Sequence, residues 1–317
     1  MNRGQSLNAG TPGRDFEVTC DLVTALLEDQ HRDLAHFEPR LADEGWDNFM
    51  FRLGDDLAVR LPRRAAMANL IYHEQTWLPG LAAQLPIRVP APFRVGIPAC
   101  GYPWRWSVVP WLAVQPADQN GPAQSQATSW GKFLRSLHVP APPDAPINPV
   151  RGVPLSQRAH AVEERMGRLS SRTRSITARI RQIWEAGSNA PMDAPATWLH
   201  GDLHPRNVLV EQGSISGVID WGDMTSGDCA TDLASIWMLF SDPGARDHVL
   251  AAYTQCSEAT LQRAQAWAVS FGVMLLDTGL KDNARNAALG ARILEIIDLT
   301  AEPTTKRLGA PASRRRV

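Results

Sequence analysis

Four polar side chains bracket one short β-favouring stretch in the second half of the chain. Their order is His200-x-Asp202-x4-Asn207, followed after an apolar segment by an isolated Asp220. A positioned carboxylate can orient a hydroxyl group and accept its proton, and amide and carboxylate oxygens are the hard ligands that Mg²⁺ prefers. Phosphoryl transfer needs these two contributions and little covalent chemistry from the protein. The spacing therefore indicates a phosphoryl-transfer site.

The stretch between these side chains is predicted to be a β-hairpin. Two apolar runs, NVLV and SGVID, flank a turn at 211–213. Such a hairpin places the polar residues at its two outer ends. An Asp or Asn at the end of a hairpin is, taken alone, most simply a turn former. The combined spacing of Asp202, Asn207 and Asp220 is what favours a phosphoryl-transfer site over simple turn residues.

The two loops resemble the catalytic and metal loops of the aminoglycoside phosphotransferase family, a branch of the protein-kinase-like fold. They read HGDLHPRN at 200–207 and DWG at 220–222, where protein kinases have H-R-D-x-x-x-x-N and D-F-G. A further segment, GDCATDLASIW at 227–237, is similar to the start of a helix in the family, with Cys229 in place of the usual Pro. The resemblance covers roughly residues 40–300 and implies the kinase fold and reaction class.

The resemblance also implies a role for each loop residue. Asp202 corresponds to the catalytic base, and Asn207 and Asp220 correspond to the residues that hold Mg²⁺. His200 and Asp232 correspond to supporting residues, since the equivalent Asp in the family hydrogen-bonds the backbone of the catalytic loop.

The small N-terminal lobe is expected to bind the nucleotide, ATP or GTP. A kinase-like lobe needs a cation on its third strand and a helix Glu to hold it, and Arg60 and Glu74 occupy these places. The usual residue is Lys. Arg keeps the charge and binds phosphate with a bidentate fork, although the two residues are not interchangeable. The loop from Gly45 to Asn48 would cover the phosphates. The plainer alternative is an Arg and a Glu on a solvated surface.

The segment 108–112, VVPWL, falls where the family has the hinge between its lobes. That hinge contacts the nucleotide base with one backbone C=O and with the N–H two residues later. The register that uses the Pro110 C=O and the Leu112 N–H suits this sequence, because proline keeps its acceptor and lacks only the donor.

The elements around these loops predict an α+β, bilobal fold with a cleft between the lobes, and the resemblance implies that this fold is protein-kinase-like. The N-terminal nucleotide-binding lobe, 1–112, would carry an antiparallel sheet, and the mostly helical C-terminal lobe, 113–317, would carry the two loops and the acceptor site. Strands are predicted at 41–46, 49–53, 57–61, 92–97 and 105–112. Helices are predicted at 17–36, 65–83, 127–138, 155–187, 230–240, 244–256, 259–279 and 283–299.

Composition excludes several other classes of protein. The net charge of −1 argues against a general nucleic-acid or membrane-surface binder, which usually has a basic excess. Four scattered cysteines without a CxxC pair suggest neither a zinc site nor a disulfide framework. Without an apolar signal or membrane-spanning segment, we expect a cytoplasmic protein. Residues 1–14 and 308–317 are expected to be disordered.

The acceptor is expected to be a small molecule with a hydroxyl group. From Asp220 to Thr300 the chain has eleven acidic residues against five Lys or Arg, a balance that would attract a cationic, aminoglycoside-like antibiotic. The candidate ammonium contacts are Asp223, Asp228, Asp277 and Asp282. The simpler interpretation is that these acids are helix caps or solvated residues. A metabolic kinase for a choline-, sugar- or macrolide-type acceptor and a catalytically silent nucleotide-binding module stay open as alternatives, as do the oligomeric state and the choice between ATP and GTP.

Overall fold

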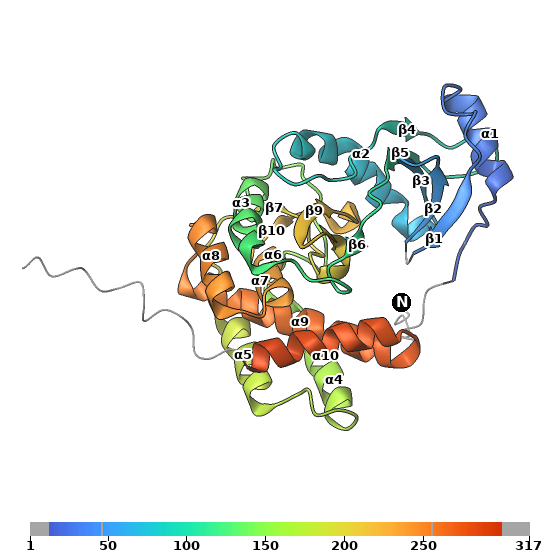
Figure 1. Ribbon diagram of the computed structural model, residues 1–317. Coiled ribbons are helices and arrows are strands. Elements are labelled where there is room, and N and C mark those ends of the chain that lie inside the picture. Colours follow the sequence, from blue (N-terminus) through green and yellow to red (C-terminus); the bar gives the residue numbers. More distant parts are fainter. Residues whose placement is uncertain (1–12, 46, 255, 300–317) are drawn as a thin grey trace, which may run out of the picture.

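The computed structural model describes residues 13–45, 47–254 and 256–299, with a five-stranded sheet beside a larger helical part (Figure 1). All neighbouring strands are antiparallel, in the order β1-β2-β3-β5-β4. The strands are β1 (Arg40–Glu44), β2 (Asn48–Leu53), β3 (Leu57–Pro62), β4 (Arg94–Gly96) and β5 (Trp106–Pro110).

Two helices flank this sheet. Helix α1 (Cys20–Gln30) buries its apolar side chains in a cluster with aromatic residues of β2, such as Phe49 and Phe51. Helix α2 (Ala68–Ala82) carries the buried Glu74 and contacts the short 3₁₀ turn at Trp221–Asp223. The second helix therefore links the sheet to the helical part of the molecule.

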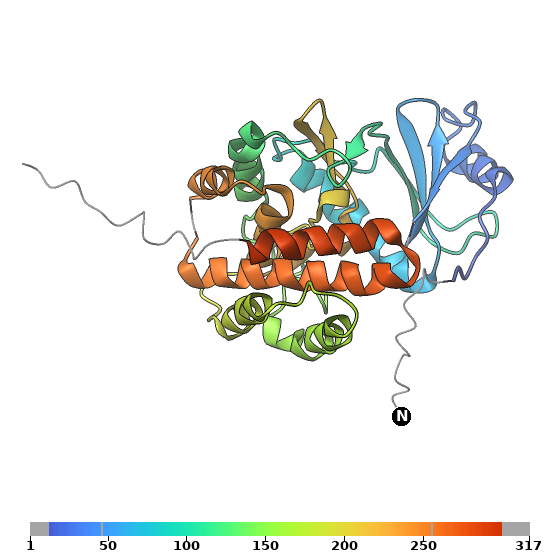
Figure 2. The same cartoon turned by 60° about the horizontal axis from the view of Figure 1, so that its bottom comes forward.

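Eight helices of the described chain follow the sheet: α3 (Ala127–Leu137), α4 (Ala159–Ser170), α5 (Ala178–Asn189), α6 (Ala230–Leu233), α7 (Ser235–Leu239), α8 (Pro243–Tyr253), α9 (Glu258–Asp282) and α10 (Ala284–Asp298). Helices α9 and α10 lie side by side, and α4 and α5 pack against α9 from below in both views (Figures 1 and 2). Glycine permits this close contact. A Cβ on Gly290 would come within 2.4 Å of the Leu276 backbone nitrogen.

The predicted hairpin is formed by β8 (Val208–Glu211) and β9 (Ser214–Val218), and β6 (Gln115–Pro116) extends it. A separate two-stranded ladder pairs β7 (Thr197–Leu199) with β10 (Thr225–Gly227). Strand β7 leads directly into the 200–207 loop, and β10 follows the 220–223 segment. The two polar loops are therefore anchored at the same end of these strands.

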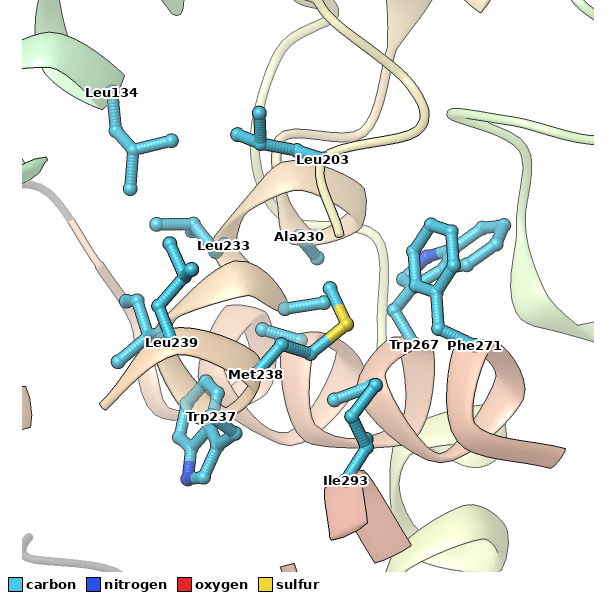
Figure 3. Close-up of a cluster of buried hydrophobic side chains, with 14 of the residues drawn as sticks. Leu134, Leu203, Ala230, Leu233, Trp237, Met238, Leu239, Trp267, Phe271 and Ile293 are labelled. Atoms are coloured by element: carbon cyan, nitrogen blue, oxygen red, sulfur yellow. The ribbon is translucent and has the colours of Figure 1, made fainter. Parts of the chain in front are cut away.

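A large apolar cluster supports the loops from the helical side. Leu203, the residue after Asp202, belongs to this cluster together with Leu134 and Leu233 (Figure 3). Trp267 and Phe271 of α9 border the same cluster. Burial of Leu203 fixes the position of the loop backbone beside the acid.

The α+β, kinase-like fold class is confirmed, and the predicted strands and most helices are present. Two predicted helices are each divided in two. The helix predicted at 230–240 is α6 and α7, and the one at 155–187 is α4, which ends at Ser170, and α5, which begins after Thr177. The Thr177 hydroxyl accepts a hydrogen bond from the Ile180 N–H, and such caps compete with a continuous helix. The predicted helix at 17–36 ends already at Gln30, whose side chain bonds the Ile97 backbone instead.

None of the helices in the described ranges is long and apolar enough to cross a membrane. The tail predicted to be disordered, 308–317, lies outside the described residues, as do residues 1–12 of the predicted N-terminal segment. The division of the chain into lobes at residue 112 stays a prediction.

Candidate active site

The loop at 200–207 is held by Asp232, the first acid of α6. The carboxylate of Asp232 accepts hydrogen bonds from the backbone N–H groups of His200 (2.7 Å) and Gly201 (2.9 Å) and is fully buried. These are the contacts that the family resemblance implied for Asp232. Gly201 has φ +86°, and a Cβ there would meet the Asp223 backbone oxygen at 2.4 Å. The loop therefore requires glycine at this position.

His200 connects the two polar loops. Its Nε2 lies 2.9 Å from the Ile219 carbonyl oxygen, and the Asp202 N–H donates to its Nδ1 at 3.2 Å. This arrangement assigns the proton of a neutral imidazole to Nε2. The buried ring packs on Trp221. His200 thus joins the backbone of Asp202 to the residue that precedes Asp220.

Asn207 lies against Asp202. Its Nδ2 donates to the Asp202 carbonyl oxygen at 2.8 Å and lies 3.4 Å from the Asp202 carboxylate. The Ile219 N–H donates to the Asn207 carbonyl oxygen at 2.9 Å. The three predicted loop residues, Asp202, Asn207 and Asp220, therefore come together through direct contacts or through a neighbouring residue.

The carboxylate of Asp202 is enclosed by positive and polar groups. Nη2 of Arg151 lies 2.6 Å from Oδ1, and Nε2 of His204 lies 3.3 Å from Oδ2. Burial alone would raise the pKa of the Asp202 carboxyl, but the charge of Arg151 and the hydrogen bond from His204 hold it well below its usual range. Asp202 is therefore ionised at neutral pH.

The sheet contributes one charged side chain to this site. Arg60 of β3 donates to Oδ1 of Asp220 at 2.8 Å and pairs with Glu74 of α2 at 3.1 Å. With its amide oriented so that the oxygen faces the guanidinium, Asn48 accepts from Nη2 and Nε of Arg60 at 2.9 and 3.0 Å. Arg60 is 7% exposed, so the pair with Glu74 is internal and the surface alternative for it is wrong.

The remaining predicted nucleotide contacts lie at two places. The Gly45 N–H bonds the Asn48 carbonyl oxygen at 3.0 Å, which closes the loop between β1 and β2. Trp46 in this loop lies outside the described residues. At the other end of the sheet, Pro110 and Leu112 border a cavity of about 500 Å³ that is also lined by Asp56, Ala82, Trp111 and residues 85–89. The lining of this cavity contains none of the catalytic-loop residues, and the hinge contacts stay a prediction.

Of the four acids predicted to contact the acceptor, the structure brings one, Asp223, to Asp202. Its carboxylate accepts from the Asn148 side chain at 2.8 Å and lies 3.7 Å from Nε of Arg151. Burial raises the pKa of Asp223 to about 6, the charge of Asp202 adds to this rise, and Arg151 opposes it.

The other three acids lie elsewhere. Asp228 is buried and receives two hydrogen bonds from Arg263, at 2.8 and 3.1 Å. Asp277 is buried and receives two from Arg168, at 2.7 and 3.2 Å. The prediction that Asp228 and Asp277 contact ammonium groups of the acceptor is therefore wrong, because each is buried and paired with an arginine. Asp282 is the last residue of α9 and is exposed.

Sequence reasoning missed Arg151, which lies in the irregular segment between α3 and α4. No helical or strand pattern marks this segment. One signal was present: Arg151, Arg158 and Arg165 recur at intervals of seven residues, and seven residues are about two helical turns. Such spacing places Arg158, next to the start of α4, and Arg165 on one helix face.

Comparison with known proteins adds a family and a fold. Residues 38–267 match the profile of the phosphotransferase enzyme family. A homoserine kinase from Methylobacterium nodulans is 30% identical over 162 residues, covering 49% of this chain and 47% of the relative. A homoserine kinase from Methylobacterium sp. (strain 4-46) is 29% identical over 206 residues, covering 60% of each. The chain thus spans about half to three fifths of the length of these curated relatives.

Solved structures share the fold. The GDP complex of aminoglycoside 2'-phosphotransferase-IIIa matches with a TM-score of 0.63 at 17% identity, over 89% of this chain and 99% of that chain. The apoenzyme of a macrolide 2'-phosphotransferase from Brachybacterium faecium matches with a TM-score of 0.55 at 20% identity, over 86% and 97% of the two chains. At these identities the matches establish the architecture and leave the acceptor undetermined.

Proposed function

Since the chain belongs to the phosphotransferase enzyme family, we propose that it transfers the γ-phosphoryl group of ATP or GTP to a hydroxyl group of a small molecule, with Asp202 as the catalytic base. The observation that carries this proposal is the contact set around Asp202. Asn207 bonds the Asp202 backbone, and Ile219, which precedes Asp220, bonds Asn207. A base and two oxygen ligands in one place are what phosphoryl transfer requires.

In the proposed reaction, the acceptor oxygen forms a bond to the γ-phosphorus as the bond to the bridging oxygen of the β-phosphate breaks. The nucleoside diphosphate leaves, and the hydroxyl proton passes to Asp202. Because Asp202 is ionised, it can accept a hydrogen bond from the acceptor hydroxyl and orient it. Asp232 would keep the loop backbone in position through His200 and Gly201.

The family chemistry implies Mg²⁺, and the donor set fits this ion. The side-chain Nδ2 of Asn207 donates to Asp202, so the side-chain oxygen Oδ1 of Asn207 is available as a metal ligand. The Asp220 side chain is 52% exposed, and Arg60 contacts its Oδ1. In the described part of the chain, no group of three or more His, Cys, Asp or Glu side chains could hold a metal, so phosphate oxygens would complete the coordination. When bound, the ion would neutralise charge on the phosphates.

Arg60 and its partners are the proposed nucleotide-phosphate contacts. The guanidinium is anchored by Glu74 and lies beside Asp220, so its position is fixed before a nucleotide binds. Gly45, Asn48, Pro110 and Leu112 belong to the same proposal as loop and hinge contacts. The four free cysteines suit the reducing cytoplasm that we propose as the location.

The acceptor predicted first, an aminoglycoside-like antibiotic, rests on the acidic balance of residues 220–300. Two of the four supporting acids are buried ion-pair partners, which weakens that support. A metabolic acceptor is favoured instead by the homoserine kinase relatives, although the matched length is partial.

A substrate panel tests the proposed function. The purified chain is incubated with ATP or GTP, Mg²⁺ and a panel of alcohols that includes hydroxy acids, amino alcohols, sugars and aminoglycosides. We expect one acceptor class to gain a phosphoryl group by mass spectrometry, and Asp202→Ala to abolish the product. Binding of nucleotide without turnover of any acceptor would support the silent-module alternative.

A further inference from the structure

Arg151 is the cation closest to the proposed base. It is 9% exposed, and its Nη2 contacts Oδ1 of Asp202 at 2.6 Å. Its guanidinium also lies over the ring of Phe271, 4.9 Å from the centroid. Its Nε is buried, lies 3.7 Å from Asp223 and has no hydrogen-bond partner within the described chain. Buried polar groups normally have partners, so this donor points to a ligand.

The positive charge around Arg151 extends beyond this one residue. Arg158 and Arg165 lie within electrostatic reach of it, and burial lowers the pKa of both. Arg165 is partly balanced by Asp277, at 3.7 Å. Nε of Arg158 is buried and, in the ranges that the structure describes, without a hydrogen-bond partner. Three arginines therefore face the acids Asp202, Asp223 and Asp277 here, and donors that these acids leave unused can bind an anionic group of the acceptor.

We propose that Arg151 binds a carboxylate of the acceptor, so that the substrate is a small hydroxy acid or hydroxy amino acid with its carboxylate a few bonds from the reacting hydroxyl. This inference rests on the function proposed above. A guanidinium has five N–H donors, and Asp202 uses one of them on Nη2. The others can hold a carboxylate in a bidentate fork. Because the same guanidinium touches Asp202, the hydroxyl of such a molecule would lie beside the base.

Asp223 suits the same class of acceptor. Its carboxylate lies beside the same guanidinium that contacts Asp202, with Nε 3.7 Å away. An ammonium group next to the substrate carboxylate would meet a negative partner there. We therefore expect a hydroxy amino acid to bind more tightly than the hydroxy acid without the amine.

Matched acceptors and matched variants test the inference. Homoserine and γ-hydroxybutyrate are compared with their neutral-headed amides, homoserinamide and γ-hydroxybutyramide, for the wild type, Arg151→Met, Arg151→Lys and the control Arg135→Met. Arg135 is exposed on α3. The quantity measured is the ratio of kcat/KM for each acid to that for its amide, so a general loss of activity cancels.

We expect the wild type and Arg135→Met to prefer the acids, and Arg151→Met to lower this preference by about 30-fold or more, as loss of one partner from a buried charge pair does. Arg151→Lys keeps a positive charge and should therefore retain part of the preference for the acids. Its activity would also show that a substitution at this position still allows the protein to fold. Phosphorylation of the amides as fast as the acids, or an unchanged ratio in Arg151→Met, would overturn the inference and leave the proposed function standing.

Failure of the proposed function gives a different result, namely no phosphoryl transfer to any of the four molecules. In that case binding alone is measured, by calorimetric titration of γ-hydroxybutyrate into the nucleotide-loaded wild type and Arg151→Met. A Kd that rises at least tenfold in the variant supports the carboxylate site. Equal affinity for both proteins, or no binding to the wild type, contradicts it.

Discussion

The guanidinium of Arg60 on β3 donates a 2.8 Å hydrogen bond to the carboxylate of Asp220, which follows the hairpin of the helical part. One side chain thus connects the sheet to the proposed metal loop, and Glu74 holds it from α2. A lysine has a single ammonium and would not hold both acids with the same forked geometry. The Arg at this position therefore matches its two partners.

Replacement of Arg60 by Met should weaken nucleotide binding. A hydrogen bond to a charged group contributes about 1.5–3 kcal/mol, so the KM for nucleotide should rise about tenfold or more. Arg60→Lys should give an intermediate value. Arg94→Lys, on the exposed edge strand β4, is the control and should leave the KM unchanged. The measurement is the KM for nucleotide by steady-state kinetics, and an unaltered KM in Arg60→Met would contradict a contact between Arg60 and the nucleotide phosphates.

Asp223 predicts a pH effect on stability. Its pKa in the folded protein is about 6, raised by burial and by Asp202. Between its ordinary value and about 6, the folded state holds more protons on this group than the unfolded state, so stability falls as the pH rises through this window. Asp223→Asn should remove this decline. Urea denaturation at several pH values should show the variant gaining stability relative to the wild type as the pH rises from about 4 to about 6, with no further gain at higher pH. A constant difference across the range would contradict the assigned pKa.

The ion pair of Asp228 with Arg263 predicts a large stability effect. Arg263→Met leaves a carboxylate that is 2% exposed without its partner, and loss of one member of a buried pair costs about 3–5 kcal/mol. Arg40→Met is the control, since the Arg40 and Glu38 side chains are 78% and 82% exposed in their pair. Its loss should cost less than about 1 kcal/mol if it behaves as a surface pair. Equal denaturation midpoints for the two variants would contradict the buried pair.

Replacement by alanine should have opposite effects on stability at two glycines, one in the contact between α9 and α10 and one outside it. Gly290→Ala should destabilise by about 1–3 kcal/mol, because its Cβ would meet the backbone of Leu276 and overpacking costs that much. Gly167→Ala, in the middle of α4, has nothing within 4 Å of the new Cβ. It should stabilise by about 0.5–1 kcal/mol, the difference in helix propensity. Thermal unfolding of both variants gives the signs, and a stabilised Gly290→Ala would show that the two helices are further apart.

The parts of this protein that could be predicted from the sequence are those with local patterns. The hairpin at 207–220 and the loop residues at its ends follow from adjacent residues, and a short turn at Gly54 specifies β2 and β3. Arg151 could not be found in this way, since it lies in an irregular segment and meets Asp202 across 51 positions of the chain. The acids at 228 and 277 were misjudged for a related reason, because charge counts along the chain do not reveal which arginine lies opposite.

Turnover by Asp202→Asn tests the central claim most directly. The substitution keeps the size of the side chain and removes its ability to accept a proton. Glu211→Gln, on the exposed end of β8, serves as the control. The assay uses saturating nucleotide and an acceptor that the wild type phosphorylates. Asp202→Asn should lower kcat by about 10²–10⁴-fold, the usual contribution of a general base, while its unfolding curve stays cooperative. A kcat within a factor of about two of the wild type would contradict Asp202 as the base.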